Sequence, residues 1–191
     1  MKNLLNLLFR ETKKTGMVVT EPQFVHQNVQ EWISKENPYQ HMTERDKAVL
    51  PSIGISINKV ARSGDDDEST RIFDRLIRDN VLSENLVVYR GVVDQKYESS
   101  LARKKKLGSN YLYYDGYIFC SLNADSYYWN RRTRMIIAIS AGSHYLFTGE
   151  YSNAAESNEF ILDKNSILRI KKEEDICDRH YIWAELVVDD M

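Results

Sequence analysis

The sequence predicts an α+β fold, in which helices come first and a region of consecutive strands follows. Apolar residues recur at helical spacing over the first part of the 191-residue chain. From about residue 85, β-branched and aromatic runs of strand length alternate with polar turns. Consecutive strands with the helices mostly ahead of them favour this class over a doubly wound parallel sheet. The length suits one domain, 1–191.

Two apolar stripes predict helices in the first part of the chain. The first stripe consists of Val25, Val29, Trp32 and Ile33. The second consists of Ile72, Phe73, Leu76 and Ile77. Asp67 or Ser69 stands ahead of the second stripe, and either is a suitable N-cap.

Short apolar runs predict the strands of the second part. They are 86–92, 116–122, 134–140, 144–149, 159–163, 166–170 and 181–188. A polar turn, 163–166, separates two of these runs and predicts a hairpin. The last run alternates and places Ile182, Ala184, Leu186 and Val188 on one face, which is typical of an antiparallel strand with one side in water.

Charge and cysteine content exclude several classes of protein. The net charge of −2 does not suggest a strongly basic nucleic-acid binder. Cys120 and Cys177 lie far apart with no metal-ligand spacing, so we expect reduced thiols and no metal. The apolar part of residues 1–14 is short and contains Asn6, which predicts an amphipathic helix rather than a signal peptide. We therefore expect no membrane association and a cytoplasmic location, in the producing or the target cell.

Three positions in the predicted strands have residues suited to binding or catalysis. Arg90 ends an apolar strand and precedes Gly91; a guanidinium fork suits phosphate, and glycine lets a ligand approach the backbone. Ser121 lies where another apolar strand passes into small polar residues. Glu159 stands where a polar loop becomes a strand. Each residue also has a purely structural explanation. Arg90 would be a solvated strand end, Ser121 a helix cap, and Glu159 an edge-strand charge that discourages aggregation.

Together and in this order, these segments resemble the arginine–serine–glutamate class of mono-ADP-ribosyltransferases, in its C3-like and binary-toxin-like branch. "ENLVVYRGV" is similar to the family's first core strand, and "GYIFCSL" lies where the family has Gly-aromatic-Ile-Ser-Thr-Ser-Leu. "SNEFILDKNSILRI" resembles its glutamate-bearing turn and strand. The resemblance implies an ADP-ribosyltransferase-type fold, with N-terminal helices packed on two small, mainly antiparallel sheets. Residues 1–84 would be mainly helical and 85–191 a β-rich NAD-binding core.

The resemblance also implies that NAD is the substrate and gives the residues their roles. Arg90 would hold the pyrophosphate or the adenosine-side ribose, and Gly91 would present backbone to the nicotinamide amide. Glu159 would bond the nicotinamide ribose and stabilise the oxocarbenium-like state as nicotinamide leaves. In the loop before the next strand, Arg131 and Arg132 would assist the phosphates. Tyr128 or Trp129 of the same loop would stack on the ligand.

The chain departs from the family pattern at the serine motif. Aligned without gaps, Ser-Thr-Ser falls on Phe119, Cys120 and Ser121, so that only the third serine is kept. The first serine, which usually braces the glutamate, is replaced by Phe119. Three interpretations stay open: Phe119 packs on nicotinamide, Ser121 does the bracing after a local shift, or the site is weak or inactive.

A second departure concerns the residues that orient the acceptor. Two residues before Glu159, the family commonly has Gln or Glu; here Ser157 stands there, with Glu156 beside it. A serine hydroxyl cannot form an ion pair with an arginine, so the resemblance points to an acceptor other than arginine.

The leading hypothesis is a mono-ADP-ribosyltransferase that modifies a macromolecule inside a cell, either a protein side chain or a nucleic-acid base. Such an enzyme suits a phage, a toxin–antitoxin or phage-defence system, or an injected effector, and an antitoxin or inhibitor is a further expected partner. The basic run 103–106, with Tyr111, Tyr113 and Tyr114 nearby, predicts either a nucleic-acid surface or a charged helix end followed by strand packing. An NAD glycohydrolase and an inert binding module are the alternatives.

Overall fold

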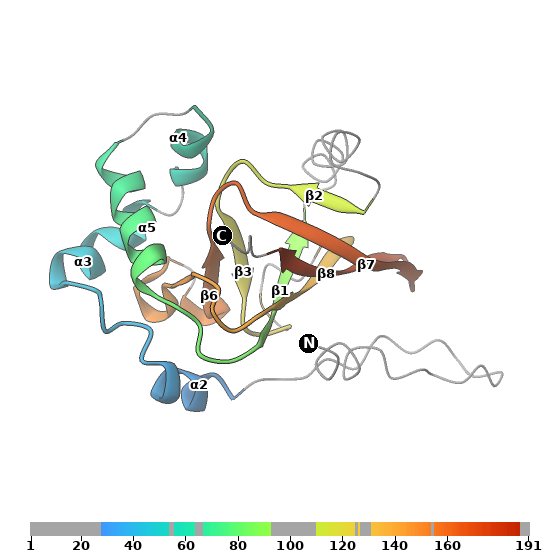
Figure 1. The fold of residues 1–191 in the computed structure, drawn as a ribbon, viewed down its shortest axis with the longest axis horizontal. Helices are drawn as coiled ribbons and strands as arrows, with labels where there is room; N and C mark the ends of the chain where they lie inside the picture. Colours follow the sequence, from blue (N-terminus) through green and yellow to red (C-terminus); the bar gives the residue numbers. More distant parts are fainter. Residues whose placement is uncertain are drawn as a thin grey trace.

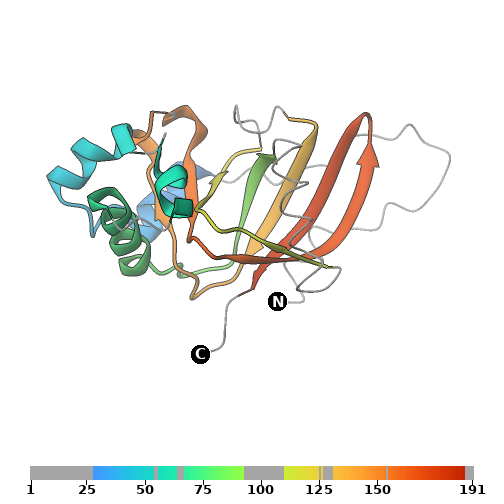
Figure 2. The ribbon, with the colours of Figure 1, turned by 90° about the horizontal axis from the view of Figure 1, so that it is seen from above.

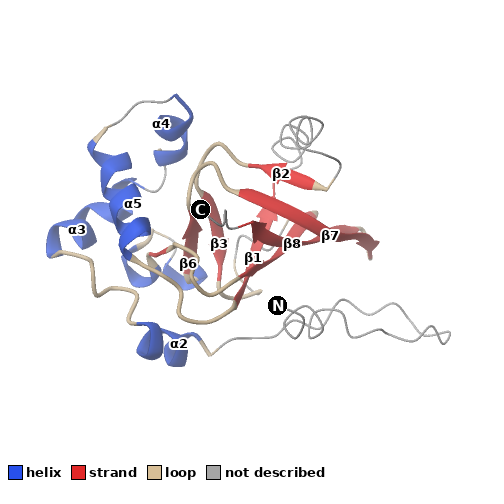
Figure 3. Ribbon diagram, viewed as in Figure 1, coloured by secondary structure: helices blue, strands red, loops and turns tan. Residues whose placement is uncertain are grey.

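The computed structural model describes residues 28–53, 56–63, 67–92, 110–124, 126, 131–153 and 155–187. Its helices lie together on one side of the molecule and its strands on the other (Figure 3). The helices are α2 (Val29–Glu36), α3 (Glu44–Ile53), α4 (Ile57–Ser63) and α5 (Glu68–Asp79). The strands are β1 (Leu86–Val92), β2 (Tyr111–Tyr113), β3 (Ile118–Ser121), β4 (Thr133–Ile139), β5 (Leu146–Phe147), β6 (Glu159–Leu162), β7 (Ile167–Ile176) and β8 (Arg179–Val187). Two short 3₁₀ turns, η2 (Gly149–Tyr151) and η3 (Ala155–Ser157), lie between β5 and β6.

The predicted helical stripes are confirmed where the structure describes them. Asp67 is the N-cap of α5, and its side chain accepts a hydrogen bond from the Thr70 backbone N–H at 2.8 Å. Asp67, and not Ser69, therefore begins this helix. The residues of its stripe that are buried are Phe73, Leu76 and Ile77. In α2, Val29 is buried and Trp32 and Ile33 pack against the core, whereas Val25 and the predicted helix in 1–14 lie outside the described residues.

All the described strands belong to one sheet, in the order β2-β7-β8-β4-β1-β3-β6-β5 (Figure 1). Only β4 and β8 pair in parallel, so the α+β class with mainly antiparallel strands is confirmed. Strands β1 and β3 are joined by a single opposed pair, Tyr89 and Ser121. The two expected sheets are thus two parts of one sheet: a larger part, β2-β7-β8-β4-β1, and a smaller part, β3-β6-β5.

The predicted hairpin across residues 163–166 is wrong. Strand β6 pairs with β3 and β5, whereas β7 pairs with β2 and β8. The turn, in which Asn165 has φ +61°, therefore carries the chain from the smaller part of the sheet to the larger one. Turn chemistry predicts a change of direction but does not identify the strand that receives the hydrogen bonds.

The last strand differs from its prediction in one respect. Ile182 and Ala184 are buried in the main core and Leu186 packs against it, as the alternation predicts, while Val188 lies outside the described residues. Tyr181 and Trp183, on the opposite face, are also buried. Strand β8 is therefore covered on both faces over this stretch, because Tyr181 and Trp183 belong to a third apolar cluster, together with Tyr89 and Ile136.

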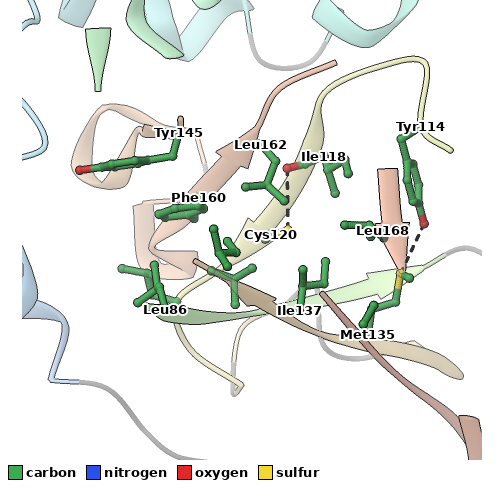
Figure 4. Packing of buried hydrophobic residues seen from close by; sticks show 14 of the residues in the cluster. Leu86, Tyr114, Ile118, Cys120, Met135, Ile137, Tyr145, Phe160, Leu162 and Leu168 are labelled. Carbon is green, nitrogen blue, oxygen red and sulfur yellow. Dashed lines mark hydrogen bonds between the residues drawn. The ribbon is translucent and has the colours of Figure 1, made fainter. Parts of the chain in front are cut away.

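The main core fills the space between α2 and one face of the sheet. Trp32 of α2 lies edge-on to Phe147 and Phe160, with ring centroids 5.1 and 6.1 Å away. Tyr145 stacks on Phe160 at 4.9 Å, and Cys120 lies between these rings and Ile137 (Figure 4). Strands β1, β3 and β6 are held together by this packing.

Helices α3, α4 and α5 pack on the smaller part of the sheet and lie away from the β7–β8 hairpin (Figure 2). Their contact is a second apolar cluster, in which Phe73 and Ile57 meet Tyr117, Leu146 and Ile161. The helical layer therefore fixes β3, β5 and β6, the strands beside Glu159.

Candidate active site

Glu159 is buried at the start of β6 and keeps 5% of its accessible surface. Its Oε2 accepts hydrogen bonds from Thr148 Oγ1 at 2.8 Å and from Ser152 Oγ at 2.9 Å. The Thr148 backbone N–H donates to the Glu159 carbonyl at 3.1 Å. A buried carboxylate needs such donors because desolvation of an unpaired charge is strongly unfavourable. Glu159 is therefore not a solvated edge-strand charge.

Ser121 is fully buried opposite Glu159 in the β3–β6 ladder. Its Oγ lies within hydrogen-bonding distance of the carbonyls of Ser157 and Asn123, and it accepts from the Asn123 backbone N–H at 2.9 Å. The hydroxyl has one proton and donates to one of these carbonyls at a time. Ser121 thus ties the end of β3 to the chain just ahead of Glu159.

Arg90 lies at the point where β1 and β3 part. Its Nη1 donates to the Phe119 carbonyl at 2.6 Å, and its guanidinium lies 5.4 Å from the centre of the Tyr114 ring. Its Nε is buried and has no hydrogen-bond partner among the residues that the structure describes. The residue as a whole is half-buried, so the rest of its guanidinium can still offer charge-assisted donors to an anionic ligand such as phosphate.

The strand register brings Arg90 and Glu159 close without making them neighbours. Glu159 lies opposite Ser121, which lies opposite Tyr89, the residue before Arg90. Two strand spacings separate the two backbones by roughly 10 Å. Because side chains alternate along a strand, Glu159 leaves the sheet on the side of Ser121 and Arg90 on the side of Cys120. Strand β3 therefore lies between the two strands that carry these charged residues.

Cys120 lies between these charges and does not ionise readily. Burial raises the pKa of its thiol to about 12, the positive charge of Arg90 acts to lower it, and the negative charge of Glu159 acts to raise it. The thiol is therefore neutral at physiological pH. Neither Cys120 nor Cys177 forms a disulfide.

Phe119 and Gly91 occupy the two strands that part at this point. The Phe119 side chain is half-buried and packs against the second apolar cluster, while its carbonyl holds Arg90. Gly91 lies opposite Arg134 near the end of β1. The substitution of phenylalanine for serine thus adds apolar packing under the helical layer and removes a hydroxyl.

Arg131 and Arg132 are exposed and immediately precede β4. The first residue of β4, Thr133, lies opposite Val92, so both arginines are near the end of β1 that carries Arg90. Their position is compatible with the predicted contact to phosphate. Tyr128 and Trp129 lie outside the described residues.

The two residues predicted to orient an acceptor differ in exposure. Ser157 is buried, with 1% of its surface accessible, and its hydroxyl finds no hydrogen-bond partner within the described part of the chain. Glu156, beside it in η3, is exposed. Solvent, and therefore a macromolecule, reaches Glu156 and not Ser157.

Thr148 and Ser152 are site residues that the sequence pattern did not reveal. They lie at the two ends of η2 and come together on Glu159. The signal was two hydroxyl residues four positions apart around Gly149, shortly before the candidate glutamate. Such a pattern is common in loops and predicts no contact by itself.

The structure describes only part of the predicted basic and aromatic surface. Tyr114 is buried under Arg90, and the basic run 103–106 lies outside the described residues. Among described side chains, no three His, Cys, Asp or Glu residues are grouped so that they could hold a metal ion. No described helix has the length and apolar character to cross a membrane.

Several solved structures that share this fold are ADP-ribosyltransferases. Plx2a, an ADP-ribosyltransferase toxin from Paenibacillus larvae, is 19% identical with a TM-score of 0.70, over 83% of this chain and 94% of its own. C3stau2 from S. aureus, solved with NAD, is 17% identical with a TM-score of 0.71, over 88% and 99%. The C3 exoenzyme of Clostridium limosum is 16% identical with a TM-score of 0.67, over 83% and 93%. Comparison with curated protein sequences gives no match.

The family model described as ADP-ribosyltransferase exoenzyme matches residues 49–188. This range contains the strands that carry Arg90, Ser121 and Glu159. The chain belongs to the ADP-ribosyltransferase exoenzyme family and is an NAD-dependent ADP-ribosyltransferase.

Proposed function

We propose that the protein transfers one ADP-ribose from NAD to a side chain of a protein inside a target cell, as a toxin or effector enzyme. The observation that carries the proposal is the buried carboxylate of Glu159, fixed by two hydroxyls and two strands away from Arg90. The similarity to toxin structures supports the biological setting. In this role an antitoxin or inhibitor is an expected partner.

Arg90 holds the phosphates or the adenosine-side ribose of NAD in this mechanism. Its half-buried guanidinium supplies charge-assisted donors, and Arg131 and Arg132 lie near the same end of β1. Gly91 offers backbone to the nicotinamide amide, and the half-buried ring of Phe119 is an apolar surface at the same junction. NAD is an extended molecule, long enough to span the roughly 10 Å between the backbones of Arg90 and Glu159.

Glu159 acts on the nicotinamide ribose. The bond between the ribose C1′ and the nicotinamide nitrogen breaks, and its electron pair leaves with nicotinamide. Positive charge then develops on the ribose, and a carboxylate about 4 Å away stabilises it by roughly 4 kcal/mol at an effective dielectric constant near 20. This corresponds to about a thousandfold in rate. The acceptor atom bonds to C1′ and gives up its proton.

Charge near Glu159 favours a protein acceptor over a nucleic acid. Glu150 and Glu156, on the two turns that lead to Glu159, are both exposed. Their negative charges oppose the approach of a phosphate backbone. Glu156 is the exposed residue that orients the acceptor, and the buried Ser157 supports the turn.

The test incubates the purified protein and labelled NAD with cell lysate or with total RNA. Wild-type protein is compared with Glu159→Gln and with Glu31→Gln, which removes an exposed carboxylate of α2. We expect label on a protein band with wild type and Glu31→Gln, and at least hundredfold less with Glu159→Gln.

Each other outcome contradicts a stated part of the proposal. Labelled RNA would overturn the protein acceptor. Free ADP-ribose without labelled macromolecule would indicate an NAD glycohydrolase. Full transfer by Glu159→Gln would overturn the assignment of the site.

A further inference from the structure

Thr148 and Ser152 form a clamp on the Glu159 carboxylate. Both hydroxyls bond the same oxygen, Oε2, at 2.8 and 2.9 Å. The distance between them is set by η2, because the Tyr151 N–H donates to the Thr148 carbonyl at 2.8 Å and the Ser152 N–H to Gly149 at 3.2 Å. Two donors on one oxygen restrict the rotation of the carboxylate plane. Oε1 is consequently presented at a fixed angle.

The clamp faces Glu159 from the side opposite to Ser121. Strand β6 lies between β3 and β5, and Thr148 directly follows β5. Ser121, at the end of β3, bonds main-chain atoms on its own side of β6. The carboxylate is therefore braced by hydroxyls that the serine motif does not supply.

Tyr39, in the connection between α2 and α3, packs against η2, the turn that carries the clamp residues at its two ends. Gly149 has φ +42°, and a Cβ at this position would lie 2.1 Å from Tyr39 Oη and 2.6 Å from the Phe147 ring. The Tyr39 ring also meets the Tyr151 ring edge-on, with centroids 5.1 Å apart. These aromatic rings leave no room for a side chain at position 149. Glycine fits there and also adopts the positive φ without strain.

Helix α3 holds the same turn at two further points. The ammonium of Lys47 lies 5.5 Å from the centre of the Tyr151 ring, and the Asn153 side-chain amide donates to the Pro51 carbonyl. The position of the clamp is thus set by the segment 39–51, which precedes the strands that carry Arg90 and Glu159.

We infer that Thr148 and Ser152 are positioning residues of the transfer reaction, which hold the Glu159 carboxylate in the orientation in which it reacts. The inference rests on the role proposed for Glu159 and makes the helical layer part of the active-site scaffold. Phe119 packs into the apolar cluster beneath that layer, where a serine hydroxyl would lose its hydrogen bonds with water.

The test compares Thr148→Val, which keeps the shape of the side chain, with Ser152→Ala and with the double variant. Thr148→Ser retains the hydroxyl and serves as the rescue variant. Ser52→Ala removes a hydroxyl of α3 that bonds the Val49 carbonyl, and is the matched control. Steady-state kinetics give kcat and KM for NAD, calorimetry gives NAD affinity, and thermal melting reports the fold.

We expect kcat to fall roughly tenfold in each single variant and about a hundredfold in the double variant, because each lost bond is to a charged group. KM for NAD and NAD affinity should stay near wild type, Tm should fall because a buried carboxylate loses hydrogen-bond donors, and Thr148→Ser should restore both kcat and Tm. A merely structural role would lower Tm but leave kcat, measured below the melting transition, at the wild-type value, and that result would overturn the inference. If the double variant does not fold, the comparison of Thr148→Val with Thr148→Ser decides.

Glu159→Gln, measured in parallel, separates this inference from the proposed function. Wild-type kcat in the double variant, with an inactive Glu159→Gln, would overturn the clamp and leave the role of Glu159 intact. An active Glu159→Gln would overturn both.

Discussion

Ser121 lies directly opposite Glu159, and its hydroxyl reaches the carbonyl of Ser157, two residues ahead of that glutamate. The main chain before Glu159 is thus fixed from β3, while its carboxylate is fixed by Thr148 and Ser152 from the other side of β6. These are separate supports, so they can be removed separately.

Ser121→Ala should weaken the fold as well as the reaction. It leaves the buried Ser157 carbonyl and Asn123 N–H without the partner they have now, at a cost of about 1–3 kcal/mol. Urea denaturation measures the change in the free energy of unfolding. Ser52→Ala, on the surface of α3, should change it by less than about 0.5 kcal/mol. Equal stability of the two variants would contradict this role for Ser121.

Arg90→Lys should weaken NAD binding by about tenfold to a hundredfold although the charge is kept. Lysine lacks the planar guanidinium of arginine. In Arg90 this group donates to the Phe119 carbonyl through Nη1 and keeps further N–H donors for a ligand. Calorimetry with NAD measures the loss. Arg62→Lys alters an exposed ion pair with Asp115 and is the control, with affinity expected near wild type. An unchanged NAD affinity in Arg90→Lys would remove Arg90 from the binding site.

Gly149→Ala should lower both stability and transfer, because it strains the backbone and displaces Tyr39 or Phe147. Gly142→Ala is a matched control: Gly142 has φ +88°, with nothing within 4 Å of the added Cβ. Both variants should lose about 1–3 kcal/mol through strain, with a further loss in Gly149→Ala. Only Gly149→Ala should lower kcat. Transfer assays and urea denaturation on the pair distinguish a displaced clamp from general destabilisation.

Stability in acid should depend on Asp46, which is buried between α3 and α5. Burial acts to raise its pKa, but hydrogen bonds from Arg75 and Thr43 outweigh this and hold the pKa below its ordinary value of 3.8. Because the folded state has the lower pKa, the stabilisation is complete above the unfolded-state value and is lost as pH falls through the folded-state value. Asp46→Asn should therefore be less stable at neutral pH. Its free energy of unfolding should also fall less steeply below about pH 4. A wild-type slope in this variant, measured by urea denaturation across the acid range, would contradict the assignment.

Local patterns in the sequence predict elements well and their partners poorly. Apolar runs identify β1 and the buried stripe of α5, because each depends on residues close in the chain. Strand β2, of three residues, carries too little pattern to be noticed. The pairing of β7 with β8 and β2, instead of β6, depends on contacts between distant residues that turn 163–166 does not encode.

The candidate site shows the same division. Arg90, Ser121 and Glu159 follow from a motif order that local sequence preserves, and the register places them on neighbouring strands. Thr148 and Ser152 could not be found in this way, since their role depends on where η2 folds back. Tyr39 is still harder to predict, because it lies in the connection between α2 and α3, more than a hundred positions before Gly149.

The single residue pair between β1 and β3 predicts a hinge between the two parts of the sheet. Rotation of the smaller part of the sheet against the larger one would strain few ladder hydrogen bonds at Tyr89 and Ser121, whereas the seven paired positions of β1 and β4 resist it. Arg90 bridges this hinge through the Phe119 carbonyl, and a bound dinucleotide would bridge it again. Amide hydrogen exchange should therefore be faster at the Tyr89–Ser121 pair than along β4, and should slow there when NAD is added.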